Sequence, residues 1–140
     1  MRKFRYLLAA AFLLSLPFVF MPNAESLSNT SIIQKGIKEN VAYTTGNDVF
    51  SSNLSFTQRN GFVRVTIAYS AASLVYFRLI GAATTNLPLN ANANVAADSL
   101  YSFDIPSRAN AGSQALTYNI RFNTNGTIRY LLVEEYSEAD

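Results

Sequence analysis

Strict alternation of apolar and polar residues near the C-terminus is the feature that most constrains how this chain can fold. Between residues 116 and 122 every second residue is apolar. The apolar members are Leu116, Tyr118, Ile120 and Phe122. A period of two predicts a strand with one face in the core and the other in water. The run at 127–133 ends in three apolar residues, as in a strand covered on both faces. Asn125-Gly126 lies between the runs and predicts a tight turn, so we expect a terminal hairpin over residues 115–136.

Shorter stretches of strand character occupy the rest of the chain between turn signals. They cover residues 32–37, 41–45, 49–58, 62–69, 74–80, 84–89 and 99–105. Asn60-Gly61 predicts a second hairpin, and Pro88 confines its strand to the edge of a sheet. About eight short strands with turn signals roughly every 8 to 12 residues predict an all-β fold, an antiparallel β-sandwich or jelly roll.

Residues 1–26 have the layout of a secretion signal. Basic residues at the start precede an apolar run at 6–16, and small residues follow at Ala24 and Ser26. The run is shorter than the roughly 20 residues that a membrane-spanning helix needs. We therefore expect a hydrophobic signal-like helix that is cleaved, with retention as a membrane anchor as the alternative. The remainder would be secreted or held at the cell surface.

The charge balance argues against a nucleic-acid partner. The chain has 11 basic and 9 acidic residues, of which three basic residues and Glu25 lie in 1–26, so eight of each remain. No positive field is left to attract phosphate. The chain also contains no His and no Cys, which removes the commonest catalytic base and the thiolate ligands. We expect no enzymatic activity, no metal and no cofactor.

Residues 27–45 are expected to form an N-terminal arm ahead of a β-sandwich domain at 46–140. The arm holds two short strands that would be marginal alone, so they need a sheet edge. That edge can lie in the same chain or in a neighbouring subunit, where the arm would become an assembly device. The candidate contact residues are Ile32, Ile33, Ile37, Val41 and Tyr43.

Tyrosine is frequent in the expected strands, and six of the eight tyrosines lie at or after residue 69. A row of tyrosines can stack on sugar rings, for which Tyr76, Tyr101 and Tyr130 are the candidates. Tyrosine also favours strands for packing reasons alone. The alternative function is therefore a secreted glycan- or protein-binding β-sandwich module.

Three segments together resemble the closing strands of small jelly-roll virion proteins, such as capsid decoration subunits. They are Leu-Tyr-Ser-Phe-Asp-Ile-Pro at 100–106, Tyr-Asn-Ile-Arg-Phe at 118–122, and the stretch at 126–135. The resemblance implies a jelly roll whose partners are copies of itself or other virion proteins. The signal-like start departs from it, because coat proteins assembled in the cytoplasm carry none. We therefore expect a non-catalytic structural subunit of an exported surface assembly, namely a filament, a coat or a virion decoration.

Overall fold

The computed structural model describes residues 31–57, 61–107 and 117–137. Within these ranges it contains eight strands and one 3-10 turn at Asn90–Asn92. The strands are β1 (Ile32–Tyr43), β2 (Leu54–Ser55), β3 (Gly61–Tyr69), β4 (Val75–Ile80), β5 (Thr85–Pro88), β6 (Leu100–Pro106), β7 (Thr117–Phe122) and β8 (Gly126–Ser137). The helix expected within residues 1–26 lies outside the described residues.

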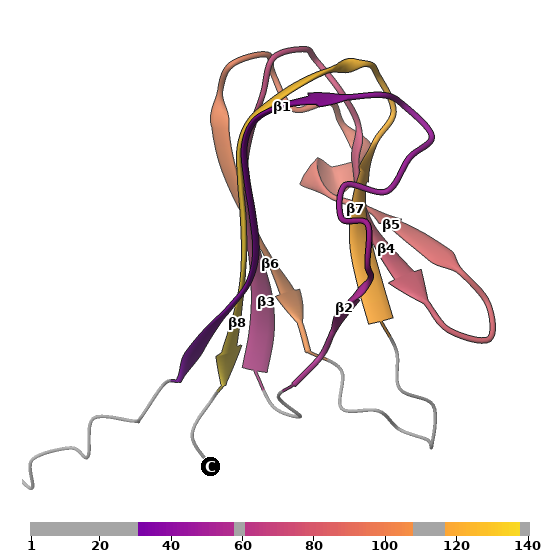
Figure 1. Ribbon diagram of the computed structural model, residues 1–140, viewed down its shortest axis with the longest axis vertical. Coiled ribbons are helices and arrows are strands. Elements are labelled where there is room, and N and C mark those ends of the chain that lie inside the picture. The colour runs from indigo at the N-terminus through magenta and orange to yellow at the C-terminus, as the bar shows by residue number, and fades with distance from the viewer. Residues whose placement is uncertain (1–30, 58–60, 108–116, 138–140) are drawn as a thin grey trace, which may run out of the picture.

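The strands form two antiparallel sheets of four, which face each other as a β-sandwich (Figure 1). Sheet A has the order β1-β8-β3-β6, and sheet B has the order β2-β7-β4-β5. Within them β1 pairs with β8, β2 with β7, β3 with β6 and β4 with β5. The chain is thus doubled back on itself at the β4–β5 turn and rolled into two layers. The expected all-β antiparallel architecture is confirmed, including Pro88 in an edge strand.

Both expected hairpins are wrong. β7 and β8 lie in different sheets, and so do β2 and β3 on either side of Asn60-Gly61. β8 has no free edge for β7, because β1 pairs with one of its edges and β3 with the other. Gly126 serves close packing: a Cβ there would lie 2.8 Å from Cζ and Oη of Tyr69. The turn signals marked where the chain reverses, but not which sheet it enters next.

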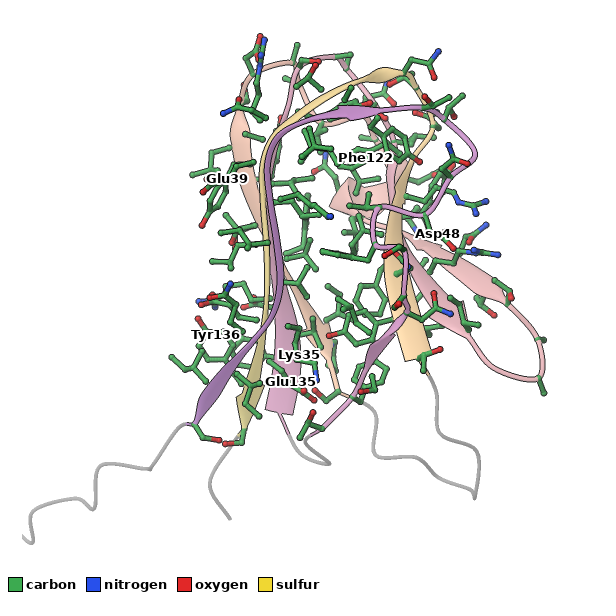
Figure 2. All side chains as sticks on the ribbon, in the orientation of Figure 1. Lys35, Glu39, Asp48, Phe122, Glu135 and Tyr136 are labelled. Atoms are coloured by element: carbon green, nitrogen blue, oxygen red, sulfur yellow. The ribbon has the colours of Figure 1, made fainter. Side chains whose placement is uncertain are left out.

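The core lies between the sheets and comes from the inward residues of β3, β4, β7 and β8. The central members are Val63, Val65, Ile67, Tyr69, Tyr118, Ile120 and Phe122, each at most 1% exposed. The rings of Tyr69 and Phe122 stack across the two layers with centroids 4.2 Å apart. Figure 2 shows Phe122 between the two layers of ribbon.

The N-terminal part departs most from the expected strands. Residues 32–43 form one continuous strand with a bulge between Gln34 and Gly36, so Ile33 and Ile37 fall on opposite faces. The strand expected at 49–58 is reduced to β2. Ahead of β2, the backbone of Phe50 bonds to a side chain and not to a neighbouring strand. The side-chain amide of Asn119 accepts from the Phe50 N–H at 3.0 Å and donates to the Phe50 carbonyl at 2.8 Å.

Alanine substitutions on the two faces of β7 should differ in their effect on the free energy of unfolding. We expect Phe122→Ala to cost about 3–5 kcal/mol, because it opens a cavity beside Tyr69. Arg121→Ala loses a part-exposed ion pair with Asp48 and should cost about 1 kcal/mol or less. Urea unfolding of both variants measures the difference, and equal losses would contradict the assigned faces.

Candidate functional site

The outer face of sheet A is formed by side chains from all four of its strands. The strand registers align its side chains in four rows across the sheet. In the order β1, β8, β3, β6 the rows are Ile32, Tyr136, Phe62 and Pro106; Gln34, Glu134, Arg64 and Asp104; Ile37, Leu132, Thr66 and Ser102; and Glu39, Tyr130, Ala68 and Leu100. Figure 2 shows Glu39 and Tyr136 on this side of the molecule, away from sheet B.

Three large apolar side chains are exposed on this face. Ile32 is 56% exposed, Ile37 44% and Leu100 69%, and all three lie in the rows above. Half-buried Tyr130 and Leu132 lie among them. The second row is wholly polar or charged, so these apolar side chains lie at separate positions on the face.

One end of the face is an ordered cluster of aromatic and charged groups. The rings of Phe62 and Tyr136 stack in parallel with centroids 4.7 Å apart. The Arg64 guanidinium lies 5.2 and 5.0 Å from these two centroids, within the range of cation–π attraction. Asp104 holds that guanidinium with two hydrogen bonds of 2.7 and 2.8 Å, and these bonds lower the pKa of Asp104. The cluster therefore links side chains of β3, β6 and β8 on this face.

A buried carboxylate, Glu135, lies between the sheets at the end where β8 closes the fold (Figure 2). Both of its oxygens lie 2.9 Å from the backbone N–H of Thr57, and the Lys35 ammonium lies 3.5 Å from Oε2. Lys35 also donates to Oγ1 of Thr57 at 2.7 Å. Burial, and then the charge of Glu135, raise the pKa of the Tyr118 hydroxyl.

This buried cluster holds strands together. Glu135 is fully buried and Lys35 is 11% exposed at its side chain. The carboxylate ties β1, which carries Lys35, and the segment after β2, which carries Thr57, to the end of β8. Its chemistry is that of a buried ion pair with hydrogen-bonded oxygens, which orders the parts it joins.

The outer face of sheet B is partly occupied by the chain itself. Asp48 accepts hydrogen bonds from Arg78 at 2.5 Å and from Arg121 at 3.0 Å. Asn119 is fully buried under the same segment, which it bonds at Phe50 and Asn53. These contacts fix residues 48–53 along β7, so the polar side chains here serve to hold the chain's own segment in place.

The arm residues are not a free arm in the structure. Of the two alternatives, pairing within the chain is the one observed: β1 runs beside β8 from Ile32 to Tyr43. Tyr43 is a core residue, whose hydroxyl donates to the Asn47 carbonyl at 2.6 Å and accepts from the Phe122 N–H at 3.1 Å. Ile33 lies opposite Glu135, while Val41 remains 40% exposed.

The three candidate stacking tyrosines do not come together. Tyr76 lies across from Arg121 on sheet B, Tyr130 lies on the outer face of sheet A, and Tyr101 stacks on Phe103 at the edge of the core. No shared platform for a sugar ring results. The sequence analysis missed the outer face of sheet A, although its signal was present in the run at 127–133, which is apolar on both faces.

Comparison with known proteins adds no family. No protein-family model matches the chain, and no curated protein matches it. Among the residues described here, no three His, Cys, Asp or Glu side chains are grouped so as to hold a metal ion. In the same part of the chain no helix has the length and apolar character needed to cross a membrane.

Replacing only one member of the buried ion pair should lower the free energy of unfolding more than replacing both. We expect Glu135→Gln to destabilise the domain by roughly 3–5 kcal/mol, because it leaves the Lys35 ammonium in the core with no carboxylate. Adding Lys35→Met to that variant should recover much of the loss. A double-mutant cycle in urea measures the coupling, and simple additivity of the two losses would contradict it.

Proposed function

We propose that this chain is a non-catalytic structural subunit of an exported surface assembly, namely a filament, a coat or a virion decoration. The observation that carries the proposal is the outer face of sheet A, where three large apolar side chains, Ile32, Ile37 and Leu100, are exposed. A soluble domain keeps such residues on one face when another protein covers them. The proposed export rests on the signal-like residues 1–26.

The proposal extends to the fold, which we take to be a jelly roll. Six of the seven connections between consecutive strands lead from one sheet to the other, and only β4 and β5 remain neighbours. A doubled-back chain rolled into two four-stranded sheets is the layout of jelly rolls, which include virus capsid and lectin domains. Fold alone does not fix function. The resemblance of the C-terminal strands to virion decoration proteins is what favours a structural role.

The position of β1 decides which kind of assembly contact is proposed. Because β1 is paired with β8 along its length, subunits need not exchange it. Contacts between subunits would then use the surfaces and edges of a complete sandwich. The glycan-binding alternative has less support, since Tyr76, Tyr101 and Tyr130 lie apart. A protein-binding module would use the same outer face for a different partner.

Assembly can be tested on the chain expressed from its full sequence, by light scattering and negative-stain electron microscopy. We expect ordered polymers, and expect the double variant Ile32→Ser, Ile37→Ser to lose them while keeping its urea transition. Losing two buried isoleucines from a contact should weaken it by about 100-fold or more. Leu87→Ser is the matched control, because Leu87 is 37% exposed on β5 of the other sheet. A stable monomer at all concentrations, or a double variant that assembles like the wild type, would refute the proposal.

A further inference from the structure

We infer that β6 is a self-pairing edge: two copies of the chain join their β6 strands antiparallel, about a two-fold axis at Phe103. The two copies of sheet A then become one continuous eight-stranded sheet. The inference rests on the proposed function, for which it names one contact between subunits and the residues that form it.

β6 is the regular open edge of sheet A (Figure 1). Among the described residues it pairs only with β3, over seven consecutive positions with no shift in register. β1, at the opposite edge, is interrupted by the bulge between Gln34 and Gly36 and by a positive φ of 51° at Asn40. Such irregularities protect an edge from pairing with another chain. Of the two edges, β6 is therefore the one able to accept a new strand.

The backbone groups of β6 are arranged for this pairing. The Ser107 N–H donates to the Gly61 carbonyl at 2.8 Å, which continues the β3–β6 ladder past the end of the strand. Alternation along an antiparallel ladder then turns the odd-numbered backbone groups toward β3 and the even-numbered ones outward. The outward N–H groups are those of Leu100, Ser102 and Asp104. Pro106 occupies the fourth outward position, so its missing N–H costs its own sheet nothing.

The sequence of β6 is self-complementary about Phe103. In the two-fold register Phe103 lies opposite Phe103 of the second copy, and Tyr101 lies opposite Ile105. On the outer face the Ser102 hydroxyl lies opposite the Asp104 carboxylate, and exposed Leu100 meets Pro106. The N–H groups of Leu100, Ser102 and Asp104 then each face an outward carbonyl of the second copy. Aromatic, apolar and hydroxyl–carboxylate pairs are the cross-strand pairs that stabilise sheets.

The neighbouring two-fold registers are worse. An axis at Asp104 would place two carboxylates directly opposite each other, which destabilises a sheet. An axis at Ser102 would place Leu100 opposite Asp104. The Phe103 register separates the two carboxylates, each of which also retains its own Arg64.

The inward side chains of β6 are incompletely covered by the core at this edge. Tyr101, Phe103 and Ile105 point between the sheets yet remain only partly buried. Their β3 neighbours Ile67, Val65 and Val63 are each 0% exposed. A second copy would continue the core, because its own inward residues would cover the exposed parts of these side chains. This need for matching apolar residues, together with the two-fold pattern, favours a second copy over an unrelated strand.

Cysteine trapping tests the register directly, since the chain has no cysteine of its own. Full chains carrying Ser102→Cys and Asp104→Cys are mixed and mildly oxidised, and disulfide-linked dimers are separated on non-reducing gels. Facing residues should have Cα atoms about 5.5 Å apart, within disulfide range. We expect the mixed dimer to predominate. Each variant alone should cross-link little, because identical residues are staggered by roughly 6 to 7 Å along the strands.

A proline substitution supplies the second readout. Ser102→Pro removes an outward N–H and should weaken the dimer by about 30-fold or more in light scattering, whereas Ser102→Ala, which keeps that N–H, should stay within about threefold. If Ser102→Pro unfolds, the cysteine result decides alone. A monomeric wild type, equal cross-linking in the single variants, or a folded Ser102→Pro that dimerises as tightly as Ser102→Ala would each overturn the inference.

The same experiments separate this inference from the proposed function. Trapped dimers without ordered polymers would support the β6 contact and refute the structural-subunit proposal. Polymers that form without the mixed disulfide, and that survive Ser102→Pro, would refute the β6 contact alone.

Discussion

The pairing of β8 on both of its edges is the constraint on which the rest of the structure depends. β1 covers one edge and β3 the other, so β8 lies inside sheet A over nearly its whole length. Its inward residues Ile128, Leu131 and Val133 are at most 1% exposed, and Glu135 ends the series by gathering Lys35 and Thr57. Because β1 forms one of the two pairings of β8, the first and last strands of the fold stabilise each other.

Much of the fold follows from the period of two, but its topology does not. Alternation correctly placed Tyr118, Ile120 and Phe122 inward, and proline correctly placed β5 at an edge. The hairpins failed because Asn-Gly reports local backbone freedom, whereas the choice of sheet depends on which edges are already paired. The bulge after Gln34 lies beside Gly36, an isolated glycine that can mark a bulge within a strand, and it reverses the faces of the residues on either side.

The candidate surface was harder to predict than the core. Exposed Ile37 and Leu100 come to lie on the same outer face only through the registers of four strands that lie far apart in the sequence. Alternation can say that a residue points outward, but not that others of its kind surround it. The same limit hid the Lys35–Glu135 pair, whose members are separated by a hundred residues. The proposed role as a subunit that meets copies of itself rests on the exposed apolar residues of one outer face and on one regular edge.

That account requires each chain to complete its own sandwich, β1 included. Urea unfolding of a chain lacking residues 27–40 tests this requirement most directly. The deletion removes the strand that covers one edge of β8, together with Lys35 beside Glu135. The account predicts loss of the cooperative transition, since an inner strand would become an exposed edge and the buried Glu135 carboxylate would lose the Lys35 ammonium. A truncated chain that still unfolds cooperatively, and that no longer assembles, would contradict it, because β1 would then belong to a neighbouring subunit.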